Sequence, residues 1–292
     1  MRRWGLPLYV LLCLIWGSTW LVIKVGYGGL GPFNVSALRF FIAGVVMAAA
    51  ALATRAQWPR DTREWGAVTA IGLLMFAADY GLIYWAEQYI ESGLTAVLFA
   101  TLPLMTLFVA RAYLPGDRIT ARKLGSTLLA LAGTIALFAD RLRLDAGAVR
   151  PMLAVLGATL CAAIATVIGK RDAHDVHPAT LNAPAMLIGA AALGVASLAH
   201  GDGLELPRDA ATWAAVAYLS LVGSVLAFLL YFSLLKTWSV MSLSFISVFT
   251  PAIALLLGFV FLDEPLSGWK AGGAVLILVA VVLATRPAPQ TA

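Results

Sequence analysis

Long apolar runs of about 20 residues, separated by short polar segments, make up most of the chain. Ten such runs can be marked, at about 7–26, 33–54, 66–86, 92–114, 121–139, 151–169, 178–199, 212–235, 240–262 and 268–285. Because an α-helix needs about 20 apolar residues to cross a bilayer, each run predicts one transmembrane helix. The loops are too short to hold a soluble domain. The pattern therefore predicts an all-α integral membrane protein with ten transmembrane helices.

Composition and charge agree with this prediction. Of the 292 residues, 61% are apolar and 12% are charged, whereas soluble domains have about 45–50% and 25%. The formal charge of +5 does not require a nucleic-acid partner, because the loops on the side of the N-terminus hold more than twice as many Lys and Arg residues as the others. The positive-inside rule then predicts both termini in the cytoplasm and a multi-pass plasma-membrane protein, with the bacterial inner membrane as the expected location.

Weak similarities between the two halves of the chain indicate an internal repeat. An offset of 148 residues takes Trp65 to Trp213, Pro103 to Pro251 and Cys13 to Cys161. We predict a first five-helix repeat over residues 1–145 and a second over 146–292, together forming one transport domain. Five is an odd number of spans, so the second repeat enters the membrane upside down. Inverted repeats are typical of secondary transporters, which hold their substrate near the midplane between the halves.

Two matched prolines indicate where that site lies. Pro103 and Pro251 each fall near the middle of a predicted span and each free the carbonyl four residues earlier, at Phe99 and Ser247. A lone proline would be read as a packing kink, but paired interruptions favour a binding site.

Helical spacing around these prolines predicts the rest of the lining. Aromatic and hydroxyl side chains recur there at intervals of three and four residues, which places them on shared helix faces. For a single aromatic residue, contact with lipid is the competing interpretation. The predicted substrate-binding residues are Trp16, Thr19, Trp20, Tyr80, Tyr84, Phe99, Pro103, Phe228, Tyr231, Ser244, Ser247 and Pro251.

Two ionisable residues fall inside predicted spans. Asp79 is the one acidic residue well inside a span, where an ionisable group is costly and a functional role is the default hypothesis. It is either a possible coupling residue or a structural aspartate hydrogen-bonded to a neighbouring helix. Arg39 lies close enough to the end of its span to extend its side chain to the membrane surface, which predicts an anchoring role.

Several motifs resemble those of EamA-type members of the drug/metabolite transporter superfamily. The similarity begins at Trp16-Gly17-Ser18-Thr19-Trp20, continues at Tyr84-Trp85-Ala86, and returns at Tyr231-Phe232 and Leu262-Asp263-Glu264-Pro265-Leu266. In one departure, Pro115-Gly116-Asp117 of the first repeat lacks a counterpart of Glu264. The resemblance implies ten helices, inverted five-helix repeats and export of small metabolites. The aromatic amino acid exporters are the most similar members in the type of cavity expected.

The leading hypothesis is a secondary transporter that exports aromatic or large neutral amino acids, or similar small metabolites, by alternating access. Sugar phosphates would require Lys or Arg deep in the cavity, and the sequence has none there. The sequence has no phosphate-binding loop, so no ATPase subunit is expected and facilitated diffusion or exchange is favoured. No cofactor or metal is expected either. A proton-coupled drug or metabolite efflux pump is the alternative.

A lipid-modifying membrane enzyme would need clustered carboxylates or histidines, and a scaffold would not explain the matched prolines. We therefore predict a transporter and not an enzyme.

Overall fold

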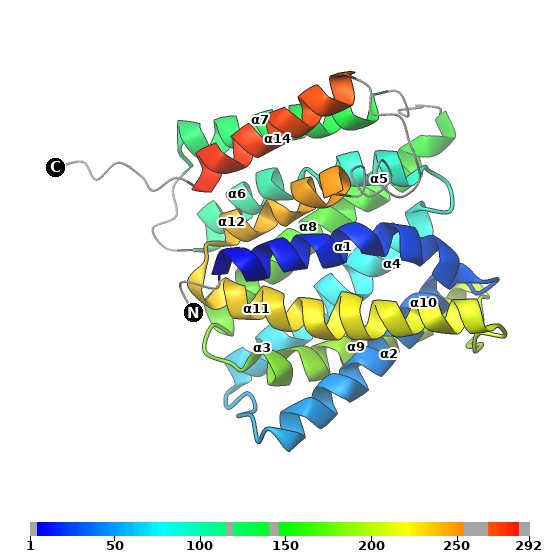
Figure 1. Ribbon diagram of the computed structural model, residues 1–292. Coiled ribbons are helices and arrows are strands. Elements are labelled where there is room, and N and C mark those ends of the chain that lie inside the picture. Colours follow the sequence, from blue (N-terminus) through cyan, green and yellow to red (C-terminus); the bar gives the residue numbers. More distant parts are fainter. Residues whose placement is uncertain (1–4, 115–118, 140–145, 254–267, 286–292) are drawn as a thin grey trace.

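A computed structural model describes residues 5–114, 119–139, 146–253 and 268–285, and these form an all-helical bundle (Figure 1). The elements in chain order are α1 (Gly5–Tyr27), α2 (Pro32–Ala53), α3 (Thr62–Ile71), η1 (Gly72–Asp79), α4 (Tyr80–Ala86), α5 (Ser92–Phe99), α6 (Leu102–Tyr113), α7 (Ala121–Phe138), η2 (Ala146–Ala148), α8 (Val149–Asp172), α9 (Pro178–His200), α10 (Ala210–Ser220), η3 (Leu221–Leu226), α11 (Ala227–Thr237), α12 (Val240–Ser244) and α14 (Gly268–Thr285).

Six of the described helical segments are long and apolar enough to cross a membrane. They are Pro32–Ala53, Thr62–Ala86, Leu94–Tyr113, Val149–Asp172, Pro178–His200 and Ala210–Thr237, and two shorter apolar helices cover Gly5–Thr19 and Val240–Ile253. The chain therefore crosses the membrane several times. The count of ten spans stays a prediction, because the second part of the expected ninth span, residues 254–262, lies outside the described residues.

The third and eighth spans share an unusual construction. Each is an α-helix that passes through a π-helical segment, η1 or η3, and then resumes as α4 or α11. Each also begins at an aspartate cap: an Asp61 carboxylate oxygen accepts from the Glu64 amide at 2.8 Å, and Asp209 accepts from the Thr212 amide at 2.9 Å. Hydrogen bonds from Thr212 hold the pKa of Asp209 below its usual range. These caps are separated by the 148-residue offset that relates the two halves of the sequence.

The fourth and ninth spans are both interrupted. The fourth ends its first helix at Phe99 and starts α6 at Leu102, with Pro103 in the first turn, where a missing amide hydrogen costs nothing. In the ninth, the helix is broken by a turn at Phe245 and runs on through Pro251. The expected interruptions are therefore present, but in the ninth span the break precedes the proline by more than one helical turn.

Contacts at the helix ends show how the spans are directed. At the end of the bundle where α1 begins, Tyr9 stacks on Trp238 at 5.0 Å, and Lys170 of α8 donates to the carbonyl of Leu235 at 2.7 Å. The start of α1 and the end of α8 therefore lie at the same end of the bundle, so these two helices run in opposite directions (Figure 1).

α7 and α14 pack on each other at one side of the bundle (Figure 1). A Cβ atom added to Gly133 would lie 2.8 Å from the carbonyl oxygen of Gly273, so only glycine allows this approach. Small residues permit such close contact between membrane helices. Neither of these two helices contributes a described residue to the lining of the cavity described below.

Candidate functional site

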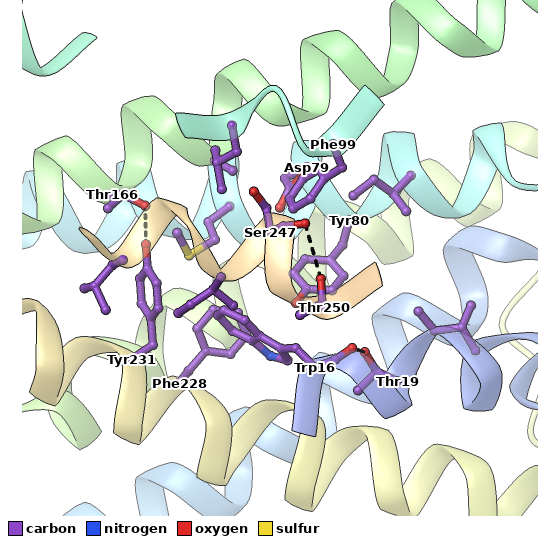
Figure 2. Close-up of a pocket in the computed structure, with 17 residues that line it drawn as sticks. Trp16, Thr19, Asp79, Tyr80, Phe99, Thr166, Phe228, Tyr231, Ser247 and Thr250 are labelled. Atoms are coloured by element: carbon purple, nitrogen blue, oxygen red, sulfur yellow. Dashed lines mark hydrogen bonds between the residues drawn. The ribbon is translucent and has the colours of Figure 1, made fainter. Parts of the chain in front are cut away.

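A cavity of about 100 Å³ lies inside the bundle, and both halves of the chain contribute to its wall (Figure 2). Its lining comes from α1, η1, α4, α5, α6, α8, α11 and the interrupted ninth span. The lining residues are Trp16, Thr19, Ile23, Met75, Asp79, Tyr80, Ile83, Phe99, Leu102, Ala162, Thr166, Phe228, Tyr231, Leu243, Ile246, Ser247 and Thr250.

Aromatic rings form one wall of the cavity. Trp16 contacts Phe228 and Tyr231, with ring centroids 5.3 and 5.4 Å apart. Phe228 in turn packs at 4.8 Å against Phe76 and at 6.3 Å against Tyr80. The rings therefore continue from the cavity into the hydrophobic core, which fixes their orientation.

The hydroxyl groups on the wall are bound to the helices that carry them. Thr19 donates to the carbonyl of Trp16 at 2.7 Å, Ser247 to that of Ser244 at 2.9 Å, and Thr250 to that of Ser247 at 3.4 Å. The last carbonyl is the one that Pro251 leaves without its helical amide partner. Thr166 and Tyr231 share a hydrogen bond of 2.7 Å (Figure 2).

Asp79 supplies the one carboxyl group of this lining. It is the last residue of η1, and only 4% of its surface is exposed. Within the described part of the chain, its Oδ1 atom has no hydrogen-bond partner. Among the described lining residues there is no Lys, Arg or His, so none of their side chains supplies a charge that would balance this carboxylate.

Arg39 corrects one expectation from the sequence. Its side chain does not reach the membrane surface: it is 1% exposed and points between the spans. The guanidinium donates to Ser224 Oγ at 2.8 Å, Tyr84 Oη at 3.1 Å and the Gly223 carbonyl at 3.1 Å. It also lies 4.8 Å from the ring centre of Tyr80. These neutral partners provide enough acceptors and aromatic surface to hold the side chain inside the bundle.

The carbonyl of Gly223 connects Arg39 to the cavity. It belongs to η3, and it also accepts from Trp16 Nε1 at 3.3 Å. A π-helical turn shifts the helical hydrogen-bond register, and such segments are frequent at functional sites. Here the Gly223 carbonyl of η3 accepts hydrogen bonds both from Trp16, which lines the cavity, and from Arg39, which lies behind it.

Some of the residues predicted from the sequence do not lie on this wall. Tyr84 is buried behind it, where it holds Arg39. Ser244 is buried and donates to the backbone carbonyl of Met241. Pro103 and Pro251 are buried in the broken spans. The backbone of Trp20 belongs to α1, whereas its side chain lies outside the described part of the structure.

The structure also adds residues that sequence reasoning missed. Most are aliphatic side chains, which carry no signal that separates a cavity wall from a hydrophobic core. Thr166 could have been found, because the 148-residue offset relates it to Ser18 beside the predicted site. Among residues 5–114, 119–139, 146–253 and 268–285, no group of three His, Cys, Asp or Glu side chains is arranged to hold a metal ion.

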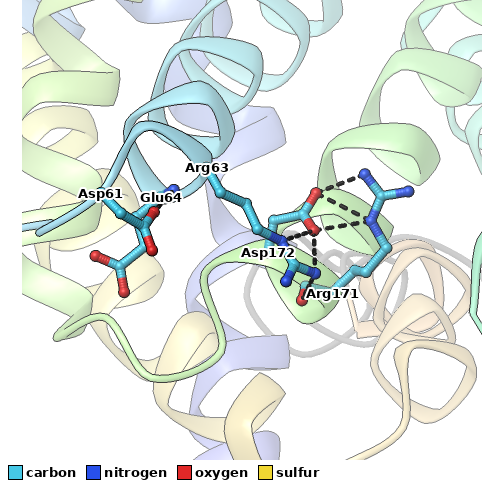
Figure 3. Close-up of polar contacts among 5 residues, drawn as sticks. All are labelled: Asp61, Arg63, Glu64, Arg171 and Asp172. Atoms are coloured by element: carbon cyan, nitrogen blue, oxygen red, sulfur yellow. Dashed lines mark hydrogen bonds and ion pairs between the residues drawn. The ribbon is translucent and has the colours of Figure 1, made fainter.

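An ion pair joins the two halves at the end of the bundle where α1 begins (Figure 3). Arg63, in the first turn of α3, contacts Asp172 at the end of α8 with a nitrogen–oxygen distance of 2.7 Å. Arg171 holds the other carboxylate oxygen at 2.6 Å. Both α8 and η1, which continues α3, line the cavity. The ion pair therefore joins two of the cavity-lining spans at a point outside the cavity.

The fold and site define a multi-pass membrane protein with a central cavity shared by two related halves. Two consecutive segments, residues 3–139 and 149–286, match the EamA-like transporter family. The chain belongs to this family of membrane transporters.

Relatives of known sequence and structure support this assignment. "Uncharacterized inner membrane transporter YedA" of Escherichia coli (strain K12) is 33% identical over 279 residues, covering 94% of this chain and 88% of that protein. "Probable amino-acid metabolite efflux pump" of the same strain is 24% identical over 292 residues, covering 97% and 95%. A crystal structure with 23% sequence identity superposes with a TM-score of 0.81 and covers 98% of this chain and 97% of the other, which supports the fold. The chain is thus a multi-pass protein of the bacterial inner membrane.

Proposed function

We propose that the chain is a secondary transporter that exports aromatic or large neutral amino acids, or similar small metabolites, by alternating access. The observation that carries this proposal is the cavity whose wall is shared by both halves of the chain. A site between two halves can be exposed to either side of the membrane when the halves move against each other.

The chemistry of the wall supports the substrate class. Aromatic rings and hydroxyl groups suit an amphipathic solute, and the described wall residues offer no cationic side chain for a phosphate. The cavity of about 100 Å³ is smaller than the sites of about 300–1,000 Å³ that hold drug-sized ligands, which favours a small metabolite. One relative is named as an amino-acid metabolite efflux pump.

The wall residues Trp16, Thr19, Tyr80, Phe99, Phe228, Tyr231 and Ser247 are the proposed substrate contacts. The full transporter has ten spans in two inverted repeats, 1–145 and 146–292, with both termini in the cytoplasm. Transport proceeds by facilitated diffusion or exchange. The lone carboxyl group of Asp79 instead favours the second candidate, a proton-coupled efflux pump.

Purified protein in liposomes tests both candidates. We expect radiolabelled phenylalanine or leucine to exchange across the membrane, and unlabelled amino acid on the other side to accelerate the exchange. An imposed pH gradient should not concentrate the solute. Accumulation driven by that gradient would favour the proton-coupled pump. If no amino acid in a full panel exchanges above the rate of empty liposomes, the proposed substrate class is wrong.

A further inference from the structure

Asp79 presents a buried negative group to the cavity without an internal partner. Its Oδ1 atom is unpaired among the described residues, and the described wall residues include no cationic side chain. Arg39 does not balance it, because its guanidinium donates to Ser224, Tyr84 and Gly223 and lies against the ring of Tyr80. A buried carboxylate needs a compensating charge. No described side chain of the wall supplies that charge, and a bound solute or a proton can.

Three of the hydroxyl groups that line the cavity together with Asp79 offer acceptors and not donors. Thr19, Ser247 and Thr250 each donate their proton to a carbonyl of their own helix. The lone pairs of their oxygen atoms are what they offer to a solute. A protonated amine matches this arrangement, because an ammonium group has several N–H donors, no acceptor and a positive charge.

The aromatic wall suits the same group. Trp16, Tyr80 and Phe228 line the cavity together with Asp79 (Figure 2). Their ring faces attract cations, and proteins use such rings to recognise ammonium ligands. A carboxylate group of a solute, in contrast, would meet the negative pole of the rings and no cation.

We propose that Asp79 binds the protonated amino group of the transported solute, and that the site selects amphipathic amines over carboxylates of the same size. This inference rests on the proposed function and makes it narrower: the ammonium group is what the cavity recognises, and the α-carboxylate of an amino acid contributes little to binding. A simple arylalkylamine should therefore bind at least as well as the corresponding amino acid.

The experiment compares four probes of similar size on the full-length protein: 2-phenylethylamine, phenylalanine, 3-phenylpropanoate and 2-phenylethanol. Binding is measured by calorimetry in detergent, and exchange is measured in liposomes. The variants are Asp79→Asn, Asp79→Glu and Ser247→Ala. Asp175→Asn makes the same chemical change on an exposed loop residue and serves as the control.

We expect the natural protein to bind both amines at least tenfold more tightly than 3-phenylpropanoate. Asp79→Asn should weaken amine binding about tenfold or more and leave binding of the alcohol within about twofold. Ser247→Ala should weaken amine binding by a smaller factor, and Asp79→Glu should keep the preference for amines. Asp175→Asn should not alter it. If Asp79→Asn fails to fold, the Ser247→Ala and Asp79→Glu variants still test the preference.

Each contrary result has a defined meaning. Equal losses for amine and alcohol in Asp79→Asn would make Asp79 a structural residue and overturn the inference. Unchanged amine binding in that variant, with loss of pH-driven accumulation, would overturn it in favour of a proton carrier. If amino acids exchange in liposomes but no amine preference is found, the inference fails and the proposed function stands. Asp79-dependent amine binding without any exchange would support the inference and show that the proposed function is wrong.

Discussion

Trp16 combines two contacts at the level of a single residue: its ring packs on Phe228 and its Nε1 atom donates to Gly223. The ring supplies apolar surface to the cavity, and the hydrogen bond holds it against η3. The indole is therefore both a wall and a link to the π-helical segment.

Replacing Trp16 should separate these two contributions. We expect Trp16→Ala to weaken solute affinity by about tenfold or more, because a buried aromatic contact is removed. Trp16→Phe keeps a ring without the donor and should have a smaller effect. Exchange kinetics in liposomes measure both, with expression in the membrane as the check on folding. Unchanged kinetics in Trp16→Ala would show that this residue does not contact the solute.

Arg39 acts from behind the cavity. Its charge has no carboxylate partner among the described residues, and it is satisfied by a carbonyl, two hydroxyl groups and the ring of Tyr80. A lysine could not make these contacts together, because its ammonium is a compact point charge without the planar fork of arginine.

We expect both Arg39→Gln and Arg39→Lys to destabilise the protein, by about 2 kcal/mol or more, since hydrogen bonds from a buried charged group are lost. Thermal unfolding in detergent measures this loss. Arg150→Gln, at an exposed position, is the matched control and should unfold near the temperature of the natural protein. If the Arg39 and Arg150 variants unfold alike, the buried network does not stabilise the bundle.

At the level of elements, the two π-helical segments border the site in both halves. Asp79 ends η1, and the Gly223 carbonyl of η3 holds Trp16 and Arg39. Close packing at Gly223 fits this role: a Cβ atom there would lie 3.0 Å from Thr19 and 3.4 Å from Arg39 Nη2. The position therefore tolerates only a glycine without rearrangement of the wall.

This packing predicts a contrast between two glycines in helices. Gly223→Ala should displace Thr19 or Arg39 and lower the transport rate severalfold. Gly194→Ala, where the nearest atom would be 3.8 Å away, should be neutral or slightly stabilising, because alanine is favoured in helices by about 1 kcal/mol. Initial rates and unfolding temperatures check both variants. Equal effects at the two positions would argue against the packing role of Gly223.

The spans and the aromatic wall could be predicted from the sequence, because about 20 apolar residues and helical spacing carry direct physical signals. The expected last span, 268–285, has the same bounds as α14. The π-helical segments could not be predicted, since their apolar sequences resemble those of ordinary helices. The prediction that Arg39 reaches the membrane surface was wrong, because the position of a residue in its span does not reveal hydrogen-bond acceptors on other spans, such as Ser224. Tyr84 has the spacing of a wall residue, but its hydroxyl group accepts a hydrogen bond from Arg39 behind the cavity.

On the scale of the whole molecule, a charged contact between described residues joins the two halves near the ends of the cavity-lining helices. This contact is the Arg63–Asp172 pair, which lies where α3 begins and α8 ends (Figure 3). The Arg63 side chain is 64% exposed, so the pair is worth about 1 kcal/mol at most. That amount is small for folding, but it changes the populations of two conformations about fivefold.

We therefore predict that Asp172→Asn favours opening at the end of the bundle where α1 begins. In a background that lacks Cys13 and Cys161, a Ser247→Cys substitution provides a reporter inside the cavity. Its labelling by a membrane-impermeant maleimide is measured from each side in oriented vesicles. Asp172→Asn should raise the rate from the α1-start side by up to about fivefold and lower the rate from the other side. Arg208→Gln, which breaks an exposed pair with Glu205 within one half, should change neither rate. An unchanged ratio of the two rates in Asp172→Asn would show that this ion pair does not bias alternating access.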